Sequence, residues 1–239
     1  MKTITFFAIG VLFLLVSAVS CTNDFDVSGN GIQASENRTV PAFSKVNSHG
    51  AFQVYITSGE ESSVVVSADE NLLQFIDTWV SEGTLHIKTD NLHSVRAVIP
   101  MEVFIKTLVL NGIYLSGSGL VESDLFQGDD VKIVLSGSGR IQSSFEVQEA
   151  TILLSGSGRI DVSGFAGKAD VTVSGSGKIN GAGFEIADCK TLTSGSGDMW
   201  LTIGDDLDSR ISGSGNVFYY GNPTVKTYIS GSGNVYHQE

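Results

Sequence analysis

The sequence is poor in proline, in cysteine and in positive charge, and each shortage excludes a class of protein. Its 239 residues include 3 prolines and 2 cysteines, and 14 lysine and arginine residues stand against 26 aspartate and glutamate residues. Two cysteines are too few for a disulfide framework or for a cysteine-rich zinc site. The formal net charge of −12 at pH 7 repels nucleic-acid phosphates and anionic membrane surfaces. We therefore predict no nucleic-acid partner.

Charged residues of either sign are also scarce, at 17%, whereas hydrophobic residues make up 41% of the chain. A composition this apolar is not that of a disordered protein, and the length is sufficient for a domain with a substantial core. Glycine, by contrast, is abundant, with 28 residues, and its spacing carries the main signal in the sequence.

The first twenty residues have the layout of a secretory signal peptide. Lys2 gives a positive start, residues 4–19 carry no charge, and small residues lead into Cys21. A cysteine there resembles the lipidation site of a bacterial lipoprotein, so we predict removal of residues 1–20 and a lipid on Cys21. The chain is then secreted across the inner membrane and anchored to the outer membrane by that lipid alone, in the periplasm or at the cell surface. The polar residues 21–39 are predicted to form a flexible tether.

A tetrapeptide, Ser-Gly-Ser-Gly, occurs seven times in the second half of the chain, at intervals of 18 to 20 residues. Its copies begin at Ser116, Ser136, Ser155, Ser174, Ser194, Ser212 and Ser230. A fixed period near 19 indicates a solenoid in which each turn covers its neighbour. Apolar residues on both sides of the motif alternate with period two, as in β-strands. We therefore predict an all-β fold, a parallel β-helix with about 19 residues per rung.

The phase of the alternation predicts which side chains face the core. In the second copy, Val131, Ile133 and Leu135 are in phase with Gly137 and Gly139. The glycines are therefore predicted to point inward, where the opposite wall approaches closely or the strand bends, and the serines to form two outward hydroxyl ladders. We expect three short strands per rung, joined by tight corners.

Residues 40–239 are predicted to form one domain, with the Ser-Gly-Ser-Gly rungs in residues 111–239 and an irregular, β-rich N-terminal cap with early rungs in residues 40–110. Solenoid ends expose strand edges that need protection. Within the cap, residues 71–80 carry a helical stripe of apolar residues, which predicts a short helix. The segment after the last motif is short, so a homo-oligomer through the C-terminal edge is one expected way to protect it.

The phrases FSKVNSHGAFQVYITSG and DENLLQFIDTWVSEGTLHIKT precede the repeated motif. Together with the lipoprotein-like leader and the serial motif, they resemble the head GIN domain family of auto-transporter adhesins, over about residues 40–239. The resemblance implies a right-handed parallel β-helix on a secreted or cell-surface protein with an adhesin function. It supplies no catalytic residue to this chain.

Acidic pairs are the main candidates for chemistry. Asp129 and Asp130, and further on Asp205, Asp206 and Asp208, contain the carboxylates that glycosidases, lyases and calcium sites use. A rung of 18 to 20 residues leaves no room for the long loops of a catalytic cleft, and the four histidines lack metal-ligand spacing. We predict a non-enzymatic adhesion or envelope-binding module with no catalytic residue, metal or cofactor. The alternatives are a polysaccharide-active lyase or hydrolase, or a purely structural envelope protein.

Two outward rows at the last three rungs are the candidate ligand-binding site. They consist of Asp198, Asn216 and Asn234, one position past each motif, and Trp200, Phe218 and Tyr236, two positions further on. In earlier rungs the first row holds three basic residues, namely Arg140, Arg159 and Lys178. Aromatic rings beside amide and carboxylate groups suit stacking on the sugars of a glycan, or contact with a surface protein. The alternative is that the three aromatics cap the C-terminal end, packed on Tyr219, Tyr220 and Tyr228.

Overall fold

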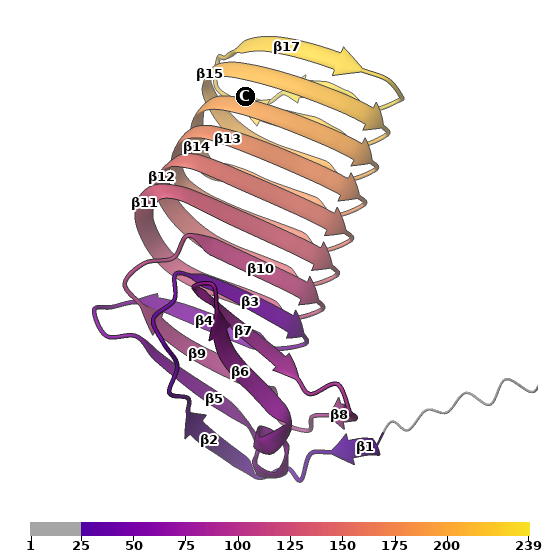
Figure 1. Ribbon diagram of the computed structural model, residues 1–239. Helices are drawn as coiled ribbons and strands as arrows, with labels where there is room; N and C mark the ends of the chain where they lie inside the picture. Colours follow the sequence, from indigo (N-terminus) through magenta and orange to yellow (C-terminus); the bar gives the residue numbers. More distant parts are fainter. Residues whose placement is uncertain (1–24) are drawn as a thin grey trace, which may run out of the picture.

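The computed structural model describes residues 25–239, so the predicted signal peptide and Cys21 lie outside the described residues. The described chain is almost entirely β-strand and is wound into a solenoid whose strands stack along one axis (Figure 1). The predicted parallel β-solenoid with rungs of about 19 residues is therefore confirmed. Within residues 25–239, no helix is long and apolar enough to cross a membrane.

Five long strands form the regular part of the solenoid. They are β11 (Leu120–Gly137), β12 (Arg140–Gly156), β13 (Arg159–Gly175), β14 (Lys178–Gly195) and β15 (Asp198–Gly213). Each strand covers a whole turn, from the residue after one motif to the first Ser-Gly of the next, and pairs in parallel with its successor. The expectation of three short strands per rung is wrong, because the backbone curves continuously through register shifts such as the one between Glu122 and Leu125.

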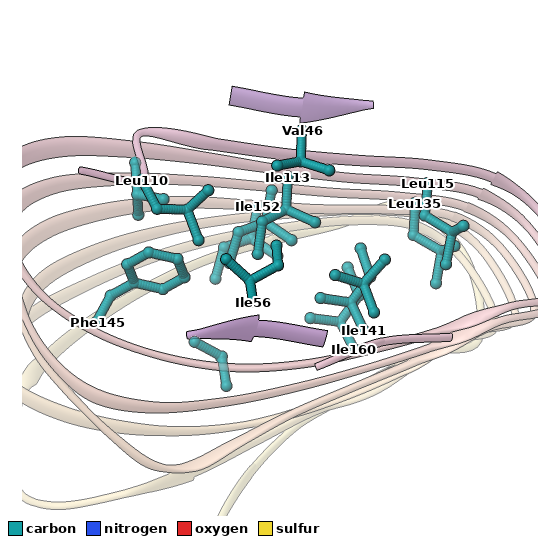
Figure 2. Close-up of a cluster of buried hydrophobic side chains, with 14 of the residues drawn as sticks. Val46, Ile56, Leu110, Ile113, Leu115, Leu135, Ile141, Phe145, Ile152 and Ile160 are labelled. Carbon is teal, nitrogen blue, oxygen red and sulfur yellow. The ribbon is translucent and has the colours of Figure 1, made fainter. Parts of the chain in front are cut away.

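The cross-section of the solenoid is flattened, and two walls of each rung face each other across a core of buried hydrophobic side chains (Figure 2). Residues before the motif, such as Leu135 and Ile152, supply one wall, and residues after it, such as Ile141 and Ile160, supply the other. All four side chains are at most 1% exposed. Burying each contributes about 1.5–3 kcal/mol, so the stacked walls are the main source of stability.

Neither glycine of the motif has room for a Cβ beside the preceding rung, and the first is needed for its backbone conformation as well. The first has a positive φ, for example 122° at Gly137, in a region that residues with a side chain avoid. The second is buried, and a Cβ on Gly139 would lie 2.6 Å from the carbonyl oxygen of Gly119 in the preceding rung. The inward second glycine and the exposed second serine are as predicted. The close neighbour, however, is the backbone of the previous rung and not the opposite wall.

The rung that precedes the first motif is built from two separate strands, β3 (Lys45–Gly50) and β4 (Gln53–Ser58). β3 pairs with β10 (Gly112–Gly117), which aligns Gly50 with Gly117, and Gly50 has a φ of 110°. His49-Gly50-Ala51-Phe52 therefore occupies the position of the motif in this rung, as a degenerate eighth copy that the sequence did not reveal.

Antiparallel strands close the N-terminal end of the solenoid (Figure 1, indigo and purple). β9 (Glu102–Thr107) lies between β4 and β5 (Ser63–Asp69), and β5 pairs in turn with β2 (Gln33–Asn37). On the other wall, β3 pairs with β7 (Thr84–Thr89). The outermost strands at this end, β2 and β6 (Ile76–Ser81), therefore pair in antiparallel fashion, unlike the parallel strands of the repeating rungs.

The helix expected over residues 71–80 is wrong beyond its first turn. The structure has a 3-10 helix, η1 (Glu70–Phe75), followed by β6 (Ile76–Ser81), which forms an antiparallel hairpin with β7. Glu82 and Gly83 connect the two strands with φ values of 51° and 70°, as a tight hairpin turn requires. Of the four apolar residues that suggested a helical stripe, Leu72 and Leu73 lie in η1, whereas Ile76 and Val80 also fit the alternation of a strand.

Part of the segment expected to be a flexible tether is folded. β1 (Phe25–Ser28) pairs in parallel with β8 (His93–Arg96), and β2 pairs with β5. Asp69, which is buried, holds this region together by accepting backbone hydrogen bonds from Gly31 at 2.7 Å, Val98 at 2.9 Å and Ile99 at 3.0 Å. These contacts are long-range, which is why local composition did not indicate them.

Three short strands complete the C-terminal end. They are β16 (Val217–Tyr220), β17 (Thr224–Ile229) and β18 (Val235–His237). β16 and β17 pair with the two halves of β15, and β18 pairs with β16, so the stacking of the rungs continues to the end of the described chain.

Candidate functional site

The outer side of the wall that follows the motif carries two straight columns of side chains, and we call this surface the post-motif face. The first column contains the residue directly after each motif, from Leu120 to Asn234, and the second contains the residue two positions later. Strand pairing aligns the second column as Tyr55, Glu122, Gln142, Asp161, Asn180, Trp200, Phe218 and Tyr236. Because every rung has the same register here, adjacent members are one strand spacing apart, about 4.8 Å.

All six residues of the predicted ligand-binding site lie together on this face. The ring centroids of Trp200 and Phe218 are 5.0 Å apart with an interplanar angle of 7°, and those of Phe218 and Tyr236 are 5.3 Å apart at 18°. Beside them, the backbone and the side-chain nitrogens of Asn216 donate to Asp198 Oδ1 at 2.9 and 3.1 Å. The backbone N–H of Asn234 donates to Asn216 Oδ1 at 3.1 Å.

The orientation of the three rings changes what they offer to a ligand. Their faces stack on one another along the solenoid, so the ring of Phe218 is covered on both sides, and Lys178 Nζ lies 5.9 Å from the centroid of Trp200. A sugar therefore cannot stack between the rings. Ring edges point outward instead, and an aromatic edge carries the positive part of the quadrupole, which attracts oxygen acceptors.

Tyr219, one of the residues on which the rings would pack if they capped the end of the core, lies next to this row. In the neighbouring inward column, Tyr219 follows Leu201 and stacks on His237 with a centroid distance of 5.0 Å. Tyr219 is partly buried against the core. The row of Trp200, Phe218 and Tyr236 lies in the outward column beside Tyr219.

A second aromatic pair on the post-motif face escaped the sequence analysis. Tyr55 stacks on Phe104 with ring centroids 5.4 Å apart and an interplanar angle of 19°, at the opposite end of the same column. The signal was present, since Tyr55 follows Gly50 by five residues just as Glu122 follows Gly117. It was hidden because the motif itself is degenerate in that rung.

Charged side chains in the middle of the face are partly paired. Arg159 makes a bidentate contact with Asp161, in which Nη2 lies 2.6 Å from Oδ1 and Nε lies 2.8 Å from Oδ2. The hydrogen bonds from Arg159 hold the pKa of the Asp161 carboxyl below its ordinary value, and Asn180 contributes a further bond of 3.1 Å. Asp161 is therefore a carboxylate at neutral pH.

The outward side of the other wall carries an apolar stripe. Val134 and Leu153 are half-buried there and Leu192 is 45% exposed, in one aligned column in which Thr172 lies between Leu153 and Leu192. The sequence analysis overlooked this stripe, although runs of three apolar residues such as Ile133-Val134-Leu135 require one outward member.

The acidic residues considered for catalysis do not form one site. Asp206 and Asp208 line a groove of about 480 Å³ along the edge of the solenoid, whereas Asp129 and Asp205 border two other depressions. Two lysines, Lys168 and Lys190, lie among the acids of the groove. Its lining also includes Glu149, Asp170 and Asp188. Among residues 25–239, no group of three or more His, Cys, Asp or Glu side chains is placed to hold a metal ion.

Cys189 lies at the floor of this groove but is buried. Desolvation raises the pKa of its thiol well above the ordinary value, so the side chain stays protonated and unreactive at neutral pH. The thiol is a small apolar core group and adds no chemistry to the groove.

A comparison with protein families finds one match over most of the chain. The model of the family described as "Putative auto-transporter adhesin, head GIN domain" matches residues 42–223. A comparison with curated proteins finds no match.

Solved structures share the fold. A "putative adhesin" from Bacteroides fragilis has a TM-score of 0.83 at 21% identity, and the match covers 89% of this chain and 100% of that one. A "putative lipid binding protein" from Parabacteroides distasonis has a TM-score of 0.77 at 21% identity, covering 90% and 100%. A "putative adhesin" from Parabacteroides merdae has a TM-score of 0.70 at 20% identity, covering 90% and 99%. At these identities the likeness concerns the fold alone.

Proposed function

This chain belongs to the head GIN domain family of auto-transporter adhesins, and on that premise we propose that it is a non-enzymatic adhesion module of the cell envelope that binds a glycan through its post-motif face. The observation that carries the proposal is the aligned pair of columns on that face. Side chains at a fixed spacing on a rigid sheet make a preorganised surface, which lowers the entropic cost of binding an extended ligand.

Export and anchoring are part of the proposal. A signal peptide in residues 1–20 directs the chain across the inner membrane, and a lipid on Cys21 holds the module at the outer membrane. Labelling of cells with radioactive palmitate tests the anchor. The wild-type protein should incorporate label and the Cys21→Ser variant should not, and equal labelling of both would contradict the anchor.

The function is tested with the purified protein on arrays of glycans and matrix proteins, after protease shaving of intact cells has established surface exposure. We expect selective binding to glycans, and at least a tenfold weaker affinity for the Trp200→Ser variant, equivalent to about 1.4 kcal/mol. Cleavage of uronic-acid polymers by the purified protein would contradict a non-enzymatic role. The absence of detectable binding on every array would favour a purely structural envelope protein.

A homo-oligomer through the C-terminal edge completes the proposal. Val225 and Ile229 occupy inward positions on β17, yet they are 37% and 43% exposed, and β17 pairs only with β15 among the described strands. We expect light scattering to give a mass above that of a monomer for the wild type, and a monomer for a Val225→Lys, Ile229→Lys double variant. A Leu192→Lys variant, changed on the outer wall, should keep the wild-type mass. A monomeric wild type at all concentrations would refute the contact.

A further inference from the structure

The centre of the post-motif face is basic, although the protein as a whole is strongly acidic. Arg140, Arg159 and Lys178 occupy three successive rungs of the first column. Asp161 is the one acid in the second column of these rungs, and Arg159 neutralises it, while Glu122 and Asp198 lie in the rungs on either side. Neither Arg140 nor Lys178 makes an ion pair with any described residue, and both are exposed. Two exposed cationic side chains without an ion-pair partner among the described residues are therefore available to a ligand at this point, and Lys178 Nζ lies 5.9 Å from the ring centroid of Trp200.

Aromatic residues lie at both ends of this basic centre. Tyr55 and Phe104 stack at one end, and Trp200 begins the three-ring row at the other. Tyr55 and Trp200 are separated by five steps of strand pairing, which at roughly 4.8 Å per step is about 24 Å. A ligand that contacts both ends must be an extended chain lying along the solenoid axis.

The charges on this face also limit the chemical class of the ligand. Two free cations are few for a nucleic acid, whose dense phosphates would meet the field of a protein with a net charge of −12. Outward aromatic edges and amide side chains, such as those of Gln142 and Asn180, interact with oxygen-rich groups. A polymer with hydroxyl groups throughout and carboxylates at intervals has the matching chemistry.

We propose that the ligand of the post-motif face is a linear, carboxylate-bearing polysaccharide that spans the basic centre, with acid groups at Arg140 and Lys178 and further sugar units at the Tyr55 and Trp200 ends. This inference rests on the proposed function and specifies its ligand class. Binding should weaken as salt is raised, because exposed charge pairs are screened within about 10 Å at 0.1 M.

Calorimetric titration of the purified full-length chain with galacturonate oligomers tests the proposal. A decasaccharide should bind at least tenfold more tightly than a disaccharide, which reaches one end only, and more tightly than its methyl ester, which lacks the charge. An Arg140→Gln, Lys178→Gln double variant should lose at least tenfold in affinity for the acid decasaccharide and keep the affinity of the wild type for the ester. The Tyr55→Ser variant should bind the decasaccharide more weakly than the wild type does, and should bind the disaccharide, which occupies the Trp200 end, with unchanged affinity.

The matched control is a Lys168→Gln, Lys190→Gln double variant, which removes the same charge from the edge groove and should bind as the wild type does. Thermal melting of every variant verifies that the fold is retained. If both charge variants bind equally well while Trp200→Ser loses acid and ester alike, the acidic ligand is wrong and glycan binding at this face stands. If Trp200→Ser also binds like the wild type, the proposed function at this face is wrong as well.

Discussion

At the scale of single residues, the solenoid depends on contacts that only glycine permits. Each second glycine of the motif rests on the backbone of the rung before it, and its missing side chain is what allows the rungs to approach. Arg140 N donates to Gly119 O at 2.9 Å beside Gly139, so the same approach brings the strands into hydrogen-bonding range. Steric demand and hydrogen bonding therefore coincide at one position of the repeat.

Replacing Gly139 with alanine tests this requirement. The new Cβ would lie 2.6 Å from Gly119 O and 2.9 Å from Leu115 Cδ2, so we expect a loss of about 2 kcal/mol in the free energy of unfolding. Ser138→Ala, one residue earlier and exposed, should change it by less than about 0.5 kcal/mol. Urea denaturation measures both, and equal stability of the two variants would show that the close approach is unimportant.

Asp69 gives the fold a predictable response to acid. Burial alone would raise the pKa of this carboxyl, but hydrogen bonds from the backbones of Ile99, Gly31 and Val98 outweigh it and hold the pKa below the ordinary value of 3.8. A depressed pKa contributes stability that is complete above the unfolded pKa and is lost as the pH falls through the folded one. The stabilising contribution should therefore be present at pH 7 and disappear below about pH 4.

The melting temperatures of wild type and Asp69→Asn between pH 2.5 and pH 7 measure this contribution. The wild type should be the more stable protein at neutral pH, and the difference should shrink as the pH falls below about 4. A difference that stays constant over the whole range would mean that the ionised carboxylate is not what stabilises the loops.

At the scale of elements, the stacked aromatic row links β15, the last full turn, to the short strands β16 and β18 that follow it. Among the described residues, Phe218 on β16 stacks on a ring on each side, whereas Tyr236 on β18 stacks on one. Since a stacked pair contributes about 0.5–1.5 kcal/mol beyond its buried area, the two residues should differ in what they contribute to stability.

We expect Phe218→Ser to lower the free energy of unfolding by about 2 kcal/mol and Tyr236→Ser by about 1 kcal/mol. Hydrogen exchange of the backbone amides in β16 and β18 should accelerate in both variants, more strongly in the first. If both variants exchange like the wild type, the stacked row makes no contribution to the structure, and ligand binding is its sole role.

The elements that the sequence predicted are those in which the repeat is explicit. Seven copies of one motif determine register, phase and rung length together, so the solenoid and the alignment of Trp200, Phe218 and Tyr236 followed from spacing alone. Tyr55 was missed because its rung has lost the motif, and β6 was mistaken for helix because Ile76 and Val80, its two members of the apolar stripe, fit both periods. The pairing of β1 and β2 depends on distant segments, which no local pattern reveals.

At the scale of the whole molecule, the solenoid presents two long walls of opposite character. The post-motif face combines polar, basic and aromatic columns, whereas the opposite outer wall carries the apolar stripe that includes Leu192. Both are parts of the same rungs, so a substitution on either wall perturbs the same core. Comparing substitutions on the two walls of adjacent rungs therefore distinguishes an effect on ligand binding from an effect on folding.

The most direct measurement is therefore the glycan affinity of Trp200→Ser compared with that of Leu192→Ser, two outward substitutions on opposite walls of adjacent rungs. For the best glycan found on the arrays, the account predicts at least a tenfold loss for Trp200→Ser and none for Leu192→Ser, with similar melting temperatures for both. Unchanged affinity in Trp200→Ser, or an equal loss in Leu192→Ser, would contradict binding through the post-motif face.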